Sequence, residues 1–410
     1  MAQTIYLDHA ATTPVDPRVL KAMRPYFDRM YGNPSSFHAE GLAAQRAVLD
    51  ARTRVASILN SRPDEVIFTS GGTESDNIAI TGVIRAHRER GTHVITTAIE
   101  HHAVLEQLER LAKRGEVELT ILPVDAYGMV DRKSVEKAIT EQTVLISIMH
   151  ANNEIGTIQP IADIGRAILA YRKAHDTVYP LFHTDACQTA GALDIDVTKL
   201  HVDLLSLSAQ KFYGPKGVGV LYARRGLKIE PLVVGGGQER GLRAGTENVP
   251  GIIGLATALE LAHAEREKEN TRLIALRDRL ITGLLKLPKA RLNGHPTERL
   301  PNNANVSFLD VEGEAMILYL DAKGIRVSTG SACASTSLDP SHVILATGLS
   351  YEAAHGSIRF TLGHATTKED VMYVIKQMPV ILKLLRSISP VRLDMAHFSE
   401  TPAKKKSSQI

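Results

Sequence analysis

From about residue 65 to residue 222, short runs of β-branched and other apolar residues alternate with longer amphipathic stretches. The runs predict strands and the amphipathic stretches predict helices. The predicted strands are Val66–Thr69, His93–Ala98, Val117–Leu122, Thr143–Met149, Pro180–Thr184, Val202–Leu207 and Val218–Tyr222. The predicted helices are Thr73–Ile84, Ala103–Arg114, Arg132–Thr140 and Ile161–Ala174. This alternation favours an α/β fold, with a mostly parallel, seven-stranded sheet covered by helices on both faces, in which ligands bind beyond the carboxyl ends of the strands.

A different pattern follows the glycine-rich stretch Val233–Asn248. A long helical region comes first, and short strands and helices come after it, which is typical of an α+β domain. The strands expected there are Asn305–Leu309, Ile325–Ser328 and Ser357–Thr361. We therefore predict a large domain of residues 15–260 and a smaller domain of residues 261–395, which residues 1–14 join and which carries a mobile cysteine loop at residues 328–340.

Composition narrows the class of protein further. Lysine and arginine total 48 against 45 acidic residues, and the resulting net charge of +3 carries little information about nucleic acid or anionic membranes. We expect neither stable nucleic-acid binding nor a membrane partner. We find no run long and apolar enough to span a membrane and no basic, then apolar, leader at the start. Two cysteines are too few for a disulfide framework. We expect a cytoplasmic protein with a small-molecule or protein partner, and a disordered tail over residues 396–410.

The stretch FTSGGTESDN (Phe68–Asn77) runs from a predicted strand through two glycines into the start of a helix. Glycines allow close approach of a ligand, and Thr73 with the free N–H groups of the first helical turn would hold an anion such as phosphate. An ordinary tight turn with a threonine cap explains the same residues at least as well. No Gly-Lys-Ser/Thr follows, so the stretch is not a P-loop.

Other polar residues also follow predicted strands. His101 and His102 are adjacent and point in different directions, which makes them a poor metal pair, although one of them could stack on a flat ring. Asn153 suits either the floor of a polar pocket or a turn. Asp185 lies where an apolar strand ends, and Gln188 follows within one turn. A buried aspartate is costly unless a cation meets it, so Asp185 is the more specific signal.

Lys211 connects these features. It lies past the end of an apolar segment and before a Gly-Pro turn. Pyridoxal 5′-phosphate (PLP) needs a lysine for a Schiff base, an acid beside the pyridine nitrogen, an aromatic face and an anion site. Lys211, Asp185, a stacking histidine and the phosphate-like loop supply all four, and the combination is far more specific than any single member.

The two cysteines differ in their surroundings. Cys333 lies in VSTGSACASTSLDP (Val327–Pro340), among small residues that pack poorly. This indicates an exposed thiol on a flexible loop, which suits a nucleophile. Cys187 lies in the same segment as Asp185 and is expected to be a small filler residue.

Ordered motifs along nearly the whole chain, from Tyr6–Pro14 to Ile388–Val391, resemble the cysteine desulfurases of the IscS/NifS type. That family is a class V branch of the fold-type I PLP enzymes. The matching motifs are YLDHAATTP, YGNPSS, FTSGGTESDN, EHHAVL, HANNEIG, HTDACQTAG, SAQKFYGPKG, GGGQERGLRAGTEN, GSACAS, SIRFTLG and ISPV. The sequence SLDPSHV after Cys333 is similar to the family's first group, whose catalytic loop is long and mobile.

The resemblance implies a role for each residue of the site. Lys211 would carry PLP as a Schiff base, Asp185 would pair with the pyridine nitrogen, and His101 would stack on the ring and transfer protons. Cys333 would take the sulfur of L-cysteine as a persulfide, and Arg359 would clamp the substrate carboxylate. The other implied contacts are Asn153 and Gln188 at the phenolic oxygen, Asn153 also at the substrate, and Gly72, Thr73, Ser208 and the other subunit's Thr246 at the phosphate.

One position departs from the family's pattern. Gln210 precedes the lysine, where the family usually has histidine. An amide can donate a hydrogen bond to phosphate, but it cannot carry a proton near neutral pH. We expect a modest loss of PLP affinity and no loss of activity.

The implied reaction converts L-cysteine to L-alanine and passes the sulfur to an acceptor or scaffold protein, for iron–sulfur cluster assembly or RNA thiolation. The implied assembly is a homodimer. Two enzymatic alternatives share the fold, an aminotransferase and a cysteine or selenocysteine lyase that needs no protein thiol. A third alternative is a scaffold protein that has lost catalysis.

Overall fold

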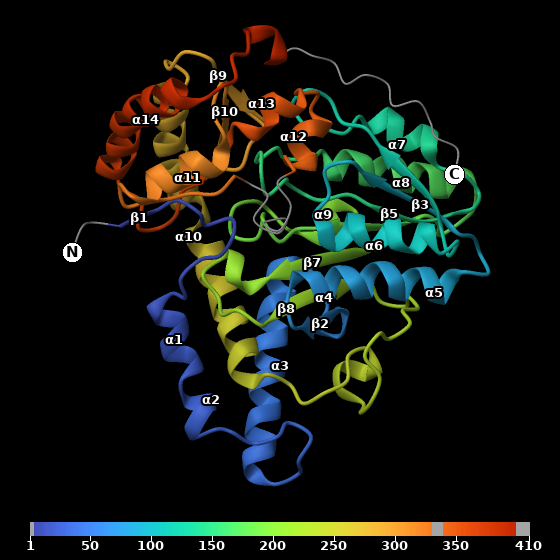
Figure 1. Cartoon of the computed structure of the whole chain (residues 1–410). Coiled ribbons are helices and arrows are strands. Elements are labelled where there is room, and N and C mark those ends of the chain that lie inside the picture. The colour runs from blue at the N-terminus through green and yellow to red at the C-terminus, as the bar shows by residue number, and fades with distance from the viewer. Residues whose placement is uncertain (1–3, 330–338, 399–410) are drawn as a thin grey trace.

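The computed structural model describes residues 4–329 and 339–398, and its largest sheet has seven strands in the order β2-β8-β7-β6-β5-β3-β4 (Figure 1). The strands are β2 (Val66–Thr69), β3 (His93–Thr97), β4 (Glu118–Leu122), β5 (Thr143–Ser147), β6 (Leu181–Asp185), β7 (Leu204–Ser208) and β8 (Gly219–Ala223). Neighbouring strands are parallel from β4 to β7, and β8 is antiparallel to both β7 and β2. The predicted seven-stranded, mostly parallel sheet is confirmed.

Helices cover both faces of this sheet. Alternate residues of one strand face different cores: Val66 and Phe68 belong to one apolar cluster and Ile67 to the other. This follows from the two-residue period of a strand. The first face is covered by α1 (Pro17–Met23), α3 (Ala39–Leu59), α7 (Arg132–Ala138), α8 (Ile161–Ala174) and α9 (Val197–Leu200). The second face is covered by the helical segment from α4 (Gly72–Asn77) to α5 (Val83–His87) and by α6 (His102–Lys113).

The helix expected over Thr73–Ile84 is not one regular helix. A π-helical turn, η2 (Ile78–Gly82), separates α4 from α5. The carbonyl of Gly82 accepts the backbone N–H of Glu230 at 3.0 Å, so a segment outside the helix uses this carbonyl. A hydrogen bond from outside the ladder is a recognised cause of such an irregular turn. The sequence gives no sign of it because the partner is far along the chain.

The rest of the chain builds two smaller sheets. One is antiparallel, in the order β12-β10-β9, and the other pairs β1 with β11 in parallel. Their strands are β9 (Ala290–Asn293), β10 (Asn303–Phe308), β12 (Ser357–Thr361), β1 (Ile5–Tyr6) and β11 (Ile325–Arg326). The helices of this part are α11 (Gly313–Asp321), α12 (His342–Ala346), α13 (Tyr351–His355) and α14 (Lys368–Ile388). The strands expected in this part are present, although each is shifted or shortened by up to two residues, except Ser357–Thr361.

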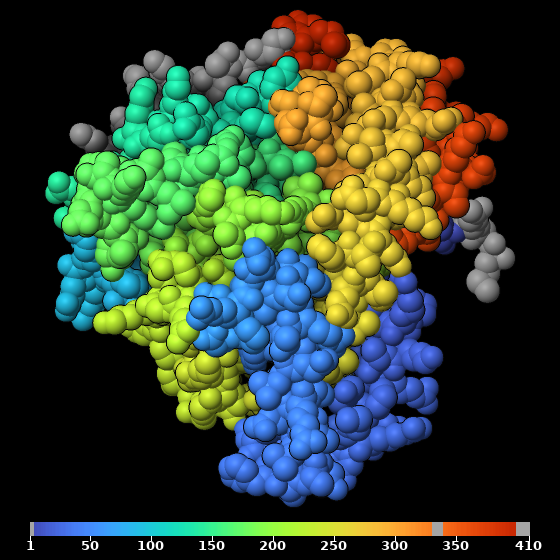
Figure 2. Space-filling view, turned by 180° about the vertical axis from the view of Figure 1, so that it is seen from behind, coloured from blue at the N-terminus to red at the C-terminus, as the bar shows by residue number. Residues whose placement is uncertain are grey.

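The long helix α10 (Val249–Leu284) runs between the two parts (Figure 1). Its apolar residues up to Leu259 pack in the core of the large sheet, and those from Leu273 onward pack in the core of the smaller sheets. The domain boundary expected near residue 260 thus falls inside a continuous helix. Figure 2 shows the blue N-terminal helices, α1, α2 (Pro25–Asp28) and α3, beside the yellow α10 at one end of the molecule.

The described chain ends in a short 3₁₀ turn, Met395–Phe398, whose Phe398 is buried. Phe398 packs with Val343, Ile344 and Leu349 in an apolar cluster. The prediction of a disordered tail is therefore wrong for residues 396–398, and residues 399–410 lie outside the described part. Within the described ranges, we find no helix that combines the length and apolarity of a membrane span.

Candidate active site

A cavity of about 400 Å³ lies at the carboxyl ends of β2, β3, β5, β6 and β7. Parallel strands bring their carboxyl ends to one edge, so residues that follow separate strands meet there. The cavity is lined by most of the site residues expected from the sequence, which are Gly72, Thr73, His101, Asn153, Asp185, Gln188, Ser208, Gln210, Lys211 and Arg359. Asp76 and Glu74 also line it, and the sequence analysis did not assign either of them.

Lys211 lies three residues beyond β7, in the 3₁₀ turn η3 (Ala209–Lys211). Its Nζ donates hydrogen bonds to the carbonyls of Ala10 and Ala11, both at 2.7 Å. Gln188 also reaches this segment, since its Nε2 donates to the carbonyl of Ala10 at 3.1 Å. The N-terminal segment is therefore one wall of the cavity, which the sequence analysis did not foresee.

Two buried carboxyl groups, those of Asp76 and Asp185, lie near each other in the cavity that Lys211 also lines. Asp185 is the last residue of β6, and its Oδ1 accepts the backbone N–H of Cys187 at 2.9 Å. Burial and the nearby Asp185 raise the pKa of Asp76 well above its ordinary value. The Oδ1 atom of Asp76 is buried without a hydrogen-bond partner among the described residues, and the Nε2 atom of His183 lies 3.6 Å from it. Burial lowers the pKa of His183 to about 4, so this histidine is neutral and does not supply a cation to the pair.

The loop after β2 presents backbone to the cavity. Gly71 has φ of 156° and ψ of −178°, a conformation that is essentially restricted to glycine. A Cβ on Gly72 would lie 2.5 Å from the Sγ of Cys187 and 3.5 Å from the Cβ of Ser208. Close packing against β6 and β7 thus explains why glycine occupies position 72. Cys187 is the filler residue that the sequence predicted: it is buried, and burial raises the pKa of its thiol well above the ordinary value.

His101 caps the helix that leaves β3. Its Nδ1 accepts the backbone N–H of Ala103 at 3.1 Å at the start of α6. Burial lowers the pKa of His101, which is partly offset by Asp185. The neutral imidazole is therefore fixed at the cavity wall by its cap. His102 does not line this cavity but packs on His342, with 4.8 Å between ring centroids.

Arg359 lies on β12 of the three-stranded antiparallel sheet and lines the cavity. Its Nη2 donates to the Oδ1 of Asp8 at 2.8 Å, and its Nη1 donates to the carbonyl of Asn153 at 3.1 Å. The Nε atom is buried and has no hydrogen-bond partner among the described residues. The sequence analysis missed Asp8, whose signal was a charged residue inside the motif YLDHAATTP.

Among the described residues, one expected site residue does not line this cavity. Thr246 is exposed and does not line it. Cys333 lies outside the described residues.

The residues present fit PLP in chemical terms. An amine, a pair of buried carboxyl groups, a neutral imidazole and a glycine-rich strand-to-helix turn line one cavity. The Oδ1 of Asp76 and the Nε of Arg359 are buried without a hydrogen-bond partner among the described residues, and buried polar atoms usually have one. The pyridinium nitrogen of PLP is a cation that suits the carboxyl pair, and a substrate carboxylate would suit the guanidinium.

This fold and site define the class of protein. The aminotransferase class-V family matches residues 5–374, and the chain belongs to this family of PLP-dependent enzymes. The cysteine desulfurase IscS of Methanosarcina thermophila is 54% identical over 389 residues, 95% of this chain and 94% of that protein. Within the family, the chain is therefore of the IscS/NifS cysteine desulfurase type.

Solved structures agree with this placement. A structure described as a NifS-like protein has a TM-score of 0.86 and 41% identity, and the match covers 93% of this chain and 100% of that one. A structure of SspA in complex with cysteine has a TM-score of 0.74 and 38% identity, and the match covers 88% of this chain and 99% of that one.

Proposed function

We propose that the enzyme desulfurates L-cysteine to L-alanine with PLP bound at Lys211, and that Cys333 receives the sulfur. The observation that carries the proposal is the cavity that brings Lys211, Asp185, His101 and Arg359 together from separate strands. The relatives named as cysteine desulfurases support the reaction class and the substrate. The sequence around Cys333 supports its role as the sulfur acceptor.

The residues that line the cavity would each contact a different part of the substrate or of PLP. Arg359 would bind the substrate carboxylate between Asn153 and Asp8, which already fix its guanidinium. Asp185, with Asp76 beside it, would pair with the pyridine nitrogen. Gly72, Thr73, Ser208 and Gln210 would hold the phosphate, and Gln188 would address the phenolic oxygen.

When bound, PLP acts as an electron sink for the α-carbon of an amino acid. The Nζ of Lys211 would hold PLP and, once the amino group of the substrate has replaced it there, would be the lysine amine that takes the α-proton. The thiolate of Cys333 would attack the sulfur of the substrate, so that a sulfur–sulfur bond forms while the carbon–sulfur bond breaks. The electron pair of that bond stays with carbon, which is protonated, and the products are L-alanine and a persulfide on Cys333. An external thiol or an acceptor protein then removes the sulfur.

The test is a product analysis. The purified, PLP-loaded protein would be incubated with L-cysteine and a reductant, and alanine, sulfide and pyruvate would be quantified. We expect equal amounts of alanine and sulfide, and we expect Cys333→Ser to abolish nearly all of both. Pyruvate in place of alanine would indicate elimination chemistry, and full activity of Cys333→Ser would indicate a lyase or an aminotransferase. A protein that does not take up PLP with a visible absorbance would revive the scaffold alternative.

Cys187 provides the matched control for that experiment. Its thiol packs against Gly72, and burial raises its pKa well above the ordinary value, which disfavours the thiolate that an attack on sulfur needs. We expect Cys187→Ala to keep the wild-type yield of alanine. Loss of activity in both cysteine variants would point to a general effect of thiol removal.

We also propose a homodimer, in which Thr246 reaches the phosphate of the other subunit. The exposed position of Thr246, away from its own cavity, supports this proposal. Light scattering at micromolar concentration checks it, and a PLP-saturated monomer would exclude the role of Thr246. The division into two domains, a sulfur-accepting or scaffold partner for iron–sulfur assembly or RNA thiolation, and a cytoplasmic location remain predictions of the sequence.

A further inference from the structure

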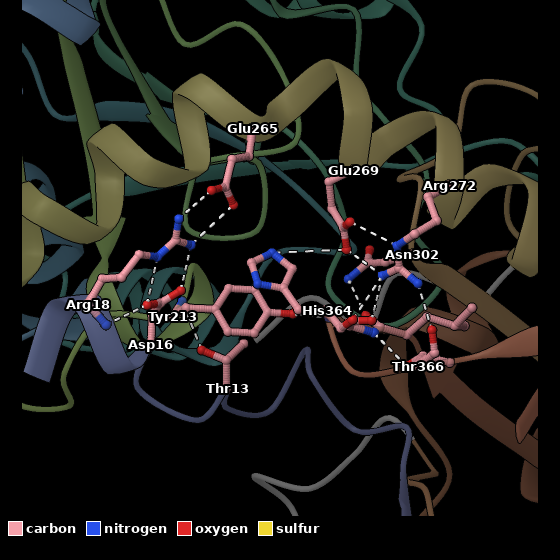
Figure 3. Close-up of polar contacts among 12 residues, drawn as sticks. Thr13, Asp16, Arg18, Tyr213, Glu265, Glu269, Arg272, Asn302, His364 and Thr366 are labelled. Carbon is pink, nitrogen blue, oxygen red and sulfur yellow. Dashed lines mark hydrogen bonds and ion pairs between the residues drawn. The ribbon is translucent and has the colours of Figure 1, made fainter.

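We propose that Tyr213 and His364 are positioning residues, whose stacked rings set where Lys211 stands relative to Arg359. This inference rests on the proposed function, since it assigns a purpose to a cluster outside the cavity. Figure 3 shows the cluster, with Tyr213 and His364 at its centre.

Tyr213 is held in an unfavourable backbone conformation two residues after Lys211. Its φ is 64°, which is uncommon for a residue with a side chain. Such a conformation persists only where the surroundings fix it. Here the N–H of Tyr213 donates to the Oγ1 of Thr13 at 2.9 Å, and its carbonyl accepts the N–H of Asp16 at 3.0 Å. These hydrogen bonds hold the backbone of Tyr213 in this conformation, and the tyrosine does not line the cavity that contains Lys211.

The ring of Tyr213 lies flat on the ring of His364. The centroids are 3.6 Å apart and the planes differ by 13°. The hydroxyl of Tyr213 accepts the backbone N–H of His364 at 2.8 Å. Tyr213 therefore contacts His364 both through its ring and through its hydroxyl. Burial raises the pKa of Tyr213, which keeps the hydroxyl neutral.

His364 follows β12, the strand that carries Arg359. Hydrogen bonds from Arg272 hold the loop that contains His364. Arg272 donates to the carbonyls of Thr366 at 2.6 Å and Gly363 at 2.9 Å. Arg272 is itself paired with Glu269, whose Oε1 lies 4.0 Å from the Nε2 of His364. The loop therefore cannot shift without breaking several charged hydrogen bonds.

Two ion pairs of Arg18 lie beside the stacked rings of Tyr213 and His364 (Figure 3). Arg18 pairs with Asp16 at 2.8 Å and with Glu265 at 2.5 Å, beside the rings (Figure 3). Burial lowers the pKa of His364, which is opposed by Glu269, Glu265 and Asp16 and reinforced by Arg272. The imidazole is thus uncharged near neutral pH, and stacking is its main contact with Tyr213.

These contacts connect Lys211 and Arg359, the two side chains proposed to act on the substrate, by two separate routes. On one side, Lys211 bonds to Ala10 and Ala11, and Asp8 of the same segment bonds to Arg359. On the other side, the chain leads from Lys211 to Tyr213, across the stack to His364, and back along β12 to Arg359. Without the stack, the separation of the amine and the guanidinium would depend on the N-terminal segment and on the hydrogen bond from Arg359 to Asn153.

The test compares His364→Ala with His364→Phe, which keeps a flat ring. For His364→Ala we expect kcat for alanine formation to fall about 2- to 10-fold with little change in KM, since an aromatic pair contributes on this scale and Arg359 still binds the carboxylate. We also expect weaker visible circular dichroism per bound PLP, because the cofactor link is less fixed. His364→Phe should recover both quantities. A second variant, Tyr213→Phe, should change them in the same direction and less.

The matched control is His175→Ala. His175 stacks on Tyr171 at 4.0 Å and 23°, at the exposed end of α8 and away from the cavity. We expect this variant to leave kcat and the visible dichroism unchanged. Folded His364→Ala with both quantities at wild-type values would overturn the inference, and so would failure of His364→Phe to rescue it. Should His364→Ala not fold, wild-type values for Tyr213→Phe would overturn it.

The dichroism needs only bound PLP and no turnover. It therefore tests the positioning role even if the wild-type protein forms no alanine, an outcome that would refute the proposed function alone.

Discussion

Arg359 and Asp8, 351 positions apart in the chain, form an ion pair with 2.8 Å between Nη2 and Oδ1. The guanidinium proposed to bind the substrate carboxylate thus already has a carboxylate partner. Asp8 orients Arg359, and its charge also offsets the attraction that a substrate carboxylate would experience.

We expect Asp8→Asn to lower KM for L-cysteine by about 2- to 10-fold, because the amide oxygen keeps the hydrogen bond while the competing charge is lost. Steady-state kinetics of alanine formation would measure this. Asp50→Asn is the control, since Asp50 pairs with Arg54 on the exposed face of α3. A rise in KM would mean that the charge of Asp8 is needed to hold the arginine in place.

Gly72→Ala should destabilise the protein by about 1–3 kcal/mol and weaken PLP binding, because the new Cβ would overlap the Sγ of Cys187. The double variant Gly72→Ala/Cys187→Ala should recover most of the stability, since the Cβ of Cys187 is 3.9 Å away. Denaturant unfolding and PLP titration of the four proteins complete the cycle. Additive effects of the two substitutions would show that the loop, and not the sulfur, resists the added methyl group.

Gln210→His should tighten PLP binding and leave kcat at saturating PLP almost unchanged. In this chain the Oε1 of Gln210 accepts the hydroxyl of Thr12 at 3.2 Å, and its backbone carbonyl accepts the N–H of Thr13 at 3.0 Å. The residue is therefore held in place by its backbone, and the side chain can be exchanged. PLP titration and alanine assays would check this, and a much faster turnover of the histidine variant would contradict it.

Glu100→Gln should make stability less dependent on pH. Burial raises the pKa of Glu100 from 4.5 to about 8, so the folded state holds a proton that the unfolded state releases above pH 4.5. The wild-type protein therefore loses stability as pH rises from about 4.5 towards 8, and a side chain that does not ionise removes that loss. Urea unfolding of the PLP-free protein at pH 5, 6, 7 and 8 would show a growing advantage of the variant.

Glu109→Gln on the exposed face of α6 is the control for this series, because its carboxyl is in solvent. A constant difference between Glu100→Gln and the wild-type protein across the four pH values would mean that Glu100 ionises in the folded state as it does in the unfolded state.

Much of this architecture could be predicted because its signals are local. Each strand of the large sheet is a short apolar run. Asp185 ends one of these strands, and Lys211 lies three residues beyond another. The α8 helix was predicted to the residue, since its apolar period is regular. The prediction that these residues lie near each other then needed only the rule that the carboxyl ends of parallel strands share one edge of the sheet.

The missed features depend on partners far along the chain. Asp76 looks like an ordinary helix residue until the fold places it beside Asp185. The π-helical turn in the α4–α5 segment needs Glu230, and the Tyr213 conformation needs Thr13. No periodicity in a single stretch encodes such pairs, so the sequence alone could not indicate them.

The N-terminal segment has a consequence for biosynthesis. Residues 5–8 pair with β11 and with β12, and Ala10 and Ala11 meet Lys211. A ribosome makes this segment before the large sheet and makes both of its strand partners after that sheet, so the wall of the cofactor cavity cannot form while the large sheet is still emerging. Uptake of PLP into a complete cavity therefore has to wait until synthesis has passed β12.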